Sequence, residues 1–372
     1  MLKALLACVF SLSLLACSTA GPPPSSSAGT RASQSPSADD GRIEVVPERY
    51  VSQSEADVEL DSLATWPTPD GHTWLIVTAK ASHELVVFDA DSGQLLRKVG
   101  GKGALPGEFS RPNGITVQGN HVLVVERDNH RVQVLSLPDF TPEGMFGEKQ
   151  LRSPYGIWID DAGADAYEVY VTDNFMLGEH YDVVPPFDEL SQRIHRYQLA
   201  FTADGRLDKA RDLGTFGSKE ESTALRIVES LAGDPAQRRL LIADEDARHE
   251  TTLREYSFDG HATGRALPAG TFKTQAEGVS LWSCTPDIGY WIAVDQSNPL
   301  THFLVFDRKT LAPRGSFKGT TTSNTDGITL HAAAMPSFPS GALFAVHDDK
   351  AISAFDLADV VSALGLDPSC SG

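Results

Sequence analysis

A short pattern recurs six times along the chain, and it constrains the fold more than any other feature. In each copy a polar residue (the opener), a small residue and an apolar residue begin an apolar strand, and a turn and a second apolar strand follow. Repeats of about 40–50 residues built from short strands are typical of β-propellers. The sequence therefore predicts an all-β fold, a six-bladed β-propeller around a central channel. The openings are Asp61-Ser62-Leu63, Asn113-Gly114-Ile115, Tyr155-Gly156-Ile157, Glu229-Ser230-Leu231, Glu277-Gly278-Val279 and Asp326-Gly327-Ile328.

The predicted propeller spans residues 42–366, and residues 367–372 form a C-terminal tail. Blade 6 begins at Asp326 and lacks an outer strand, so we expect the strand-like segment Ile43–Leu60 to supply it and close the ring. Asp359–Leu364 fits a short helix. Blade 3 carries an insertion, Phe175–Gln192, whose aromatic residues suit a wall or lid over the channel mouth, although many long loops only decorate a surface.

Polar residues are expected to gather at one rim of the channel. The first strand of each blade starts there, and the antiparallel second strand returns there, so its last residues lie beside the openers. Carboxylates held close together are costly unless a cation binds them, and many oxygen ligands suit Ca²⁺. Turns alone also favour Asp and Asn, but not Glu. The predicted groups are the openers Asp61, Asn113, Tyr155, Glu229, Glu277 and Asp326, with Asp244, Glu245, Asp246, Asp295, Gln296 and Asp348 around them.

The first 41 residues read as an export and anchoring segment. Residues 1–16 combine Lys3 with an apolar stretch of signal-peptide length, and Leu14-Leu15-Ala16-Cys17 resembles a lipobox with Cys17 as the lipid acceptor. The alternative is an ordinary signal peptide in which Cys17 is incidental. Residues 17–41 are rich in Ser, Pro, Ala and Gly and predict a disordered tether. We expect an exported bacterial lipoprotein at the outer membrane, in the periplasm or on the cell surface, held by its lipid alone.

Charge and cysteine content narrow the partners. The formal charge of −19 argues against nucleic acid, whose phosphates require Lys and Arg surfaces. A small anionic substrate would need a metal as mediator, and we expect a monomer. Cys284 and Cys370 remain in the exported chain, where they form either one disulfide or two separate thiols.

Several stretches resemble the β-propeller phytases, a family of secreted calcium-dependent phosphatases with six blades. The similar segments are Ile227-Val228-Glu229-Ser230, Ala243-Asp244-Glu245-Asp246, Ala276-Glu277-Gly278-Val279, Gln296-Ser297-Asn298, Asn324-Thr325-Asp326-Gly327-Ile328, Pro154-Tyr155-Gly156-Ile157 and Thr78-Ala79-Lys80. The first half departs from the family. The family's first strand follows a sequence with two adjacent acids, which residues 57–66 match only in part. Residues 111–117 resemble an NHL repeat instead of the family's segment. These departures leave phytate specificity open.

The resemblance implies roles for individual residues. Calcium positions would be Tyr155, Glu229, Glu245, Glu277, Gln296 and Asp326, and the ring argument adds Asp61. Lys80, Glu229, Glu245 and Tyr155 would be catalytic, and Lys80, Arg127 and Asn298 would bind substrate phosphate. Arg131 and Arg193 are further basic candidates.

Three functions remain open from the sequence. The leading one is calcium-dependent hydrolysis of a phosphomonoester, either phytate or a related ester. The second is a calcium-dependent propeller lactonase or esterase, because Arg111-Pro112-Asn113-Gly114 resembles their Asn-bearing element. The third is a surface lipoprotein that binds a ligand without catalysis.

Overall fold

The computed structural model describes residues 42–161 and 166–371, and the predicted signal peptide, Cys17 and tether lie outside them. The first three blades follow the predicted order, each with its innermost strand first. Blade 1 contains β3 (Leu60–Pro67), β4 (Thr73–Ala79), β5 (Glu84–Asp89) and β6 (Leu95–Gly100); blade 2 contains β7 (Pro112–Gln118), β8 (His121–Glu126), β9 (Arg131–Ser136) and β10 (Thr141–Phe146); blade 3 contains β11 (Pro154–Asp161), β12 (Ala166–Asp173), β13 (Ile194–Phe201) and β14 (Leu207–Phe216), with the 3₁₀ helix η1 (Leu190–Gln192).

The second half of the chain continues the same order, ending in α1 and the 3₁₀ helix η2. Blade 4 contains β15 (Val228–Asp234), β16 (Arg239–Asp244), β17 (Thr252–Ser257) and β18 (Ala262–Ala266); blade 5 contains β19 (Ala276–Ser283), β20 (Gly289–Asp295), β21 (His302–Asp307) and β22 (Pro313–Lys318); blade 6 contains β23 (Ile328–His331), β24 (Ala342–His347) and β25 (Ala351–Asp356), followed by α1 (Leu357–Leu364) and η2 (Pro368–Ser371).

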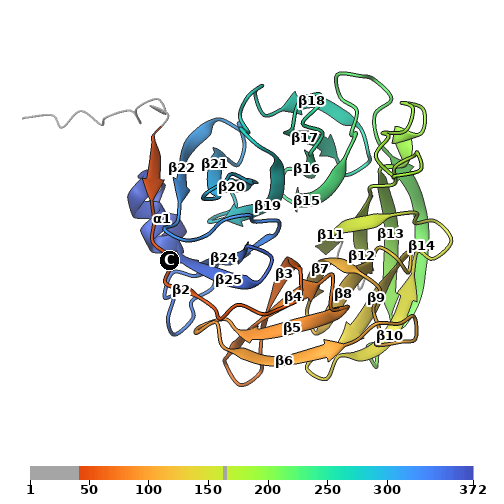
Figure 1. Ribbon diagram of the computed structural model, residues 1–372, viewed down its shortest axis with the longest axis horizontal. Helices are drawn as coiled ribbons and strands as arrows, with labels where there is room; N and C mark the ends of the chain where they lie inside the picture. The colour runs from red at the N-terminus through yellow and green to blue at the C-terminus, as the bar shows by residue number, and fades with distance from the viewer. Residues whose placement is uncertain (1–41, 162–165, 372) are drawn as a thin grey trace, which may run out of the picture. The chain divides into compact units, whose positions relative to one another are not determined.

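The six blades form a closed ring. Their innermost strands contact one another in the cyclic order β3, β7, β11, β15, β19, β23 and back to β3 (Figure 1). The apolar core is divided accordingly, because each cluster of buried side chains in the described residues lies between two neighbouring blades. The chain is therefore a six-bladed β-propeller, as the sequence predicts.

The N-terminal segment closes the ring through two strands on two different blades. β2 (Tyr50–Val51) pairs with β25 and supplies the outer strand that blade 6 lacks, as predicted. β1 (Ile43–Val45) instead pairs in parallel with β22, which gives blade 5 a fifth strand. The N-terminal segment thus pairs with the outermost strands of two blades, β22 of blade 5 and β25 of blade 6. Between β1 and β2, Val46 packs into the apolar core that blades 5 and 6 share.

In four of the six openings the neighbouring blade leaves room only for glycine. A Cβ at Gly114, Gly156, Gly278 or Gly327 would overlap the backbone carbonyl oxygen of the next blade's opener. These contacts pass from blade to blade and set the spacing of the innermost strands. In five blades the opening also contains a β-bulge, because the pairing with the second strand shifts there. Such bulges commonly re-aim a side chain at a functional edge.

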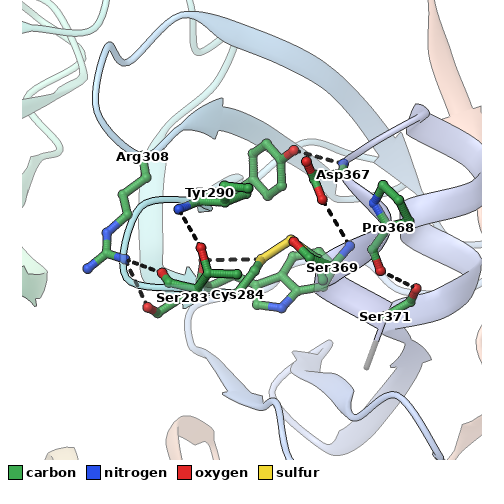
Figure 2. Close-up of a disulfide and its surroundings, with 12 residues drawn as sticks. Ser283, Cys284, Tyr290, Arg308, Asp367, Pro368, Ser369 and Ser371 are labelled. Atoms are coloured by element: carbon green, nitrogen blue, oxygen red, sulfur yellow. Dashed lines mark hydrogen bonds between the residues drawn. A yellow bond between two sulfur atoms is a disulfide. The ribbon is translucent and has the colours of Figure 1, made fainter.

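The C-terminal tail is fastened to blade 5. Cys284, directly after β19, forms a disulfide with Cys370 in η2, across 86 residues (Figure 2). The Asp367 backbone N–H also donates to the Tyr290 hydroxyl at 2.9 Å. The predicted terminal helix is present as α1, which the Asp356 side chain caps by accepting from the Ala358 N–H.

Gly156→Ala should lower the free energy of unfolding by about 1–3 kcal/mol, because the added methyl group overlaps the Glu229 carbonyl. Urea unfolding followed by tryptophan fluorescence measures this change. Ser230→Ala is the matched control, since blade 4 already carries a Cβ at the equivalent position, and it should change stability by less than about 0.5 kcal/mol. Equal effects of the two substitutions would contradict the packing argument.

Replacing both Cys284 and Cys370 with Ser should lower the free energy of unfolding by about 2–5 kcal/mol, because the disulfide restricts a long loop in the unfolded chain. Differential scanning calorimetry compares this double variant with the oxidised protein. Reduced wild-type protein should show the same loss. A double variant as stable as the oxidised protein would contradict the prediction.

Candidate functional site

The openers stand at one rim because the backbone fixes them there in the same way in nearly every blade. The residue after each second strand donates its backbone N–H to a carbonyl just before the opener. In five blades that carbonyl lies two residues before the opener: Lys80 to Glu59, Arg127 to Arg111, Asn174 to Ser153, Glu245 to Ile227 and Gln296 to Gln275. In blade 6 Asp348 donates to Ser323, three residues before Asp326. The predicted meeting of openers and second-strand ends is thus present.

Successive side chains at the end of a second strand point in opposite directions. One residue therefore holds the neighbouring loop, and the next one reaches the site. Asp295 was expected in the site, but its carboxylate accepts the backbone N–H groups of Lys273, Thr274 and Gln275. Asp244 likewise accepts from the Ile227 N–H and pairs with Arg254. These acids brace the loop that leads into the innermost strand, whereas the next residue along, Glu245 or Gln296, reaches the site.

Three glutamates form the part of the site best suited to a metal. Glu229, Glu245 and Glu277 come from blades 4 and 5, and each offers a carboxylate oxygen within 4.8 Å of the others. Glu245 and Glu277 are buried. Asn174 donates to Glu229 Oε1 at 3.1 Å, and Gln275 donates to Glu245 Oε2 at 3.3 Å. Glu245 Oε1 has no hydrogen-bond partner among the described residues.

Burial and mutual repulsion raise the pKa values of these acids. Burial, with the charge of Asp61, raises the pKa of Glu229 to about 7. Burial raises the pKa of Glu245 and of Glu277 well above the usual range, and in both the charge of Glu229 adds to the effect. A positive ion among them would remove this repulsion.

Lys80 holds the opposite side of the ring. Its ammonium lies 3.1 Å from Asp61 Oδ1, 3.1 Å from Asp326 Oδ2 and 3.5 Å from Glu59 Oε1. The Tyr155 hydroxyl is 3.4 Å from Nζ and donates to Asp61 at 3.0 Å. Burial lowers the pKa of Lys80, but the charges of Asp61 and Asp326 outweigh it and leave the pKa raised.

These contacts use the donors of Lys80 completely, because an ammonium has three N–H groups. A direct contact between Lys80 and substrate phosphate, as the resemblance implies, would require a protein oxygen to be displaced. Asp326 also accepts from Gln296 at 2.5 Å. Its pKa is raised to about 8, mainly by burial and by the charge of Asp61. The predicted calcium ligands thus fall into two groups. Glu229, Glu245 and Glu277 form one group, and Asp61 and Asp326, which already pair with Lys80, form the other.

Aliphatic side chains ring the channel directly beneath the openers. The third residue of each opening is buried and contributes to a ring of aliphatic side chains: Leu63, Ile115, Ile157, Leu231, Val279 and Ile328. A cavity of about 570 Å³, lined by all six innermost strands, continues beyond them toward the other end. An aliphatic surface beside a carboxylate favours its neutral form, which agrees with the raised pKa values of Glu229, Glu245 and Glu277.

A cavity of about 710 Å³ opens beside the glutamates, between blades 2 and 3. Tyr155 and Glu229 lie on one side of it, and Arg127, His130 and Arg152 contribute basic groups. The insertion of blade 3 supplies another wall through Phe175, Met176 and Tyr181. The insertion is therefore part of the site's surroundings, in agreement with the wall expected from the sequence.

Other candidates lie elsewhere. Asn298 is exposed, and within residues 42–161 and 166–371 no hydrogen bond joins it to the glutamates. Arg131 is buried against Glu126, and Arg193 donates to the carbonyls of Asp173, Phe175 and Arg226, so both are structural. Asp246 pairs with Arg248 and His249, and Asp348 pairs with Lys350.

Sequence reasoning missed several site residues. Asn174 belongs to the same second-strand position as Glu245 and Gln296, so the repeat places it beside the openers, although the predicted site residues did not include it. Glu59, Gln275 and Arg152 each precede an opener by two or three residues and reach the rim from the connecting loop. Their types differ from blade to blade, so the sequence pattern carries no signal for them.

Comparisons with known proteins fit the fold. An NHL repeat model matches residues 109–135, within blade 2, as the sequence suggests. A search among curated proteins found no match.

Three solved structures illustrate the similarity. The hydrazine synthase of Kuenenia stuttgartiensis has 12% identity and a TM-score of 0.44, covering 79% of this chain and 75% of that one. The nidogen/laminin complex has 15% identity and a TM-score of 0.46, covering 74% and 87%. The β-propeller domain of Myceliophteria thermophila Cps50 (Swd1) has 12% identity and a TM-score of 0.46, covering 83% and 99%. At these values the similarities carry no functional argument.

The metal-free protein should lose stability as pH rises from about 4.5 to about 8. The folded-state pKa values of Glu229 and Asp326 are raised to about 7 and about 8, so the folded state binds more protons than the unfolded state across this window. The melting temperature in chelator should therefore fall from pH 5 to pH 8. Added calcium should raise it more at pH 8, where fewer protons compete.

Glu245→Gln should flatten this pH dependence, because one of the repelling carboxylates is removed, and Asp246→Asn should preserve it. Scanning fluorimetry over pH, with and without chelator, provides the measurement. A melting temperature that rises steadily from pH 5 to pH 8 without metal would contradict the assignment of raised pKa values.

Proposed function

We propose that this protein is a calcium-dependent hydrolase of phosphomonoesters, with the glutamate triad as its metal site. The observation that carries the proposal is the position of Glu229, which belongs both to the triad and to the wall of the adjacent cavity. A cation held by Glu229, Glu245 and Glu277 would therefore face a space large enough for a substrate. Calcium is favoured because the available ligands are oxygens and no sulfur or imidazole lies among them.

The residues fit the metal by charge and by hydrogen bonding. Glu245 Oε1 is buried and has no hydrogen-bond partner within residues 42–161 and 166–371, and an unpaired buried oxygen is costly unless something binds it. When bound, calcium would neutralise phosphate oxygens and orient a water molecule for attack. Asn174 and Gln275 hold the carboxylates in place, and Tyr155 is fixed by its hydrogen bond to Asp61.

The basic residues of the cavity would receive the phosphate. Arg127 and Arg152 stand on its wall with His130, whereas Lys80 is engaged by Asp61, Asp326 and Glu59. We therefore assign Lys80 the task of keeping Asp61 and Asp326 in position and of reducing the repulsion between them. Lipidation at Cys17 would place this activity at a membrane surface, since acyl chains anchor without spanning.

A lactonase or esterase remains the second candidate because of Asn113. This opener is fully buried, and neither polar atom of its amide has a hydrogen-bond partner among the described residues. An amide oxygen is a suitable calcium ligand. Measuring lactone turnover beside phosphomonoester turnover separates the two candidates.

Purified protein should release phosphate from phosphomonoesters in calcium and lose that activity in chelator. Glu245→Gln should lower kcat/KM by roughly 100-fold, because it removes a charged ligand from the metal site. Asp348→Asn is the matched control, since this exposed acid occupies the equivalent position of blade 6 and pairs with Lys350, and it should retain activity within about threefold. Phosphate release that is absent in calcium, or indifferent to chelator, would refute the proposal.

A further inference from the structure

We infer that the 710 Å³ cavity beside the glutamates binds the organic part of the substrate, and that this part is aromatic and singly phosphorylated rather than a polyphosphorylated polyol. The inference rests on the proposed function and specifies the substrate class of the same site. It depends on three features of the cavity: a buried aromatic ring that holds an arginine at the wall, an exposed aromatic side chain at the mouth, and cationic groups that neighbouring acids largely balance.

The aromatic wall is built before any ligand arrives. Phe175 is buried and lies between two guanidinium groups, with that of Arg152 3.5 Å and that of Arg193 4.6 Å from its ring centroid. Arg193 in turn donates to the carbonyls of Asp173 and Phe175, which fixes the start of the insertion. Arg152 thus lies against this ring at the cavity wall, where it can meet a phosphate or the face of an aromatic group.

The insertion carries a second aromatic residue to the cavity mouth. Leu177 and Val183 exchange backbone hydrogen bonds, which folds the segment between them into a tight turn. Arg248 of blade 4 donates to the Asp182 carbonyl and ties this turn to the propeller. Tyr181, at 78% exposed, lines the cavity together with Met176. An exposed ring on a braced turn offers an apolar contact at little cost in ordering.

The charges of the cavity suit one phosphate group. Arg127 pairs with Asp128 at 2.7 Å, and Arg152 lies 3.6 Å from Glu189. The cationic groups on the wall are therefore largely balanced by neighbouring acids, in a protein whose formal charge is −19. A ligand with many phosphates would meet too few cations, whereas a single phosphate can be shared by the metal site and one guanidinium. The exposed surface of Tyr181, with Met176 beside it on the lining, is then left for an apolar group.

Phenylphosphonate and methylphosphonate test this inference, because neither has an ester bond to hydrolyse and they differ only in the ring. Isothermal titration calorimetry in calcium should show phenylphosphonate binding about tenfold more tightly to the wild-type protein. Tyr181→Ser should reduce that ratio to about threefold or less. Phe187→Ser is the matched control, since Phe187 is exposed on the same insertion but does not line the cavity, and it should leave the ratio unchanged.

Hydrolysis assays separate this inference from the proposed function. The ratio of kcat/KM for phenyl phosphate over that for glycerol 2-phosphate should fall in Tyr181→Ser and should stay unchanged in Phe187→Ser. Equal affinities for the two phosphonates, or a preference for phytate over phenyl phosphate, would overturn the inference even if calcium-dependent hydrolysis is found. Selective binding of phenylphosphonate without any hydrolysis would uphold the inference and overturn the proposed function.

Discussion

The close approach of the opening glycines of blades 2, 3, 5 and 6 to the next blade's carbonyl oxygen is the contact that brings most of the openers together. Gly156 can lie against the Glu229 carbonyl, and Gly278 against that of Asp326, only because glycine has no Cβ. The contact sets how near the innermost strands come, and hence how near the openers are. Carboxylates from different blades therefore meet at separations of a few ångströms, although they are distant in sequence.

The same approach creates an electrostatic problem that the protein solves only in part. Lys80 balances the carboxylates of Asp61 and Asp326 from within the ring, with Glu59 as a third partner. No comparable cation among the described residues contacts Glu245 or Glu277. The glutamates lie next to a ring of aliphatic side chains. Because a buried charge is costly in apolar surroundings, their ionised forms are disfavoured. The ring is thus asymmetric, and the asymmetry indicates where an added cation would act.

The repeat predicts the fold well because the constraint that produces it is local and periodic. The opener positions, the blade order and the outer strand donated by β2 all follow from that period. A shift of one residue, however, decides whether a second-strand side chain braces a loop or faces the channel, and Asp244 and Glu245 illustrate the difference. Both residues are acidic, so the residue type alone does not show which of the two faces the channel. β1 pairs with blade 5 because the outer edge of β22 is accessible to it. The local sequence of β1 does not indicate which sheet it joins.

The repeat indicates where the site lies but not what it binds. The candidate metal ligands and the adjacent cavity come from different parts of the chain. The glutamates are set by the periodic openings and by the strand that follows each of them. The cavity depends instead on Arg152 and on the insertion of blade 3, which interrupts the repeat and has no equivalent in the other blades. Selectivity can therefore change through the insertion without disturbing the ring. Divergence in that segment would leave the carboxylate site intact while altering what is brought to it.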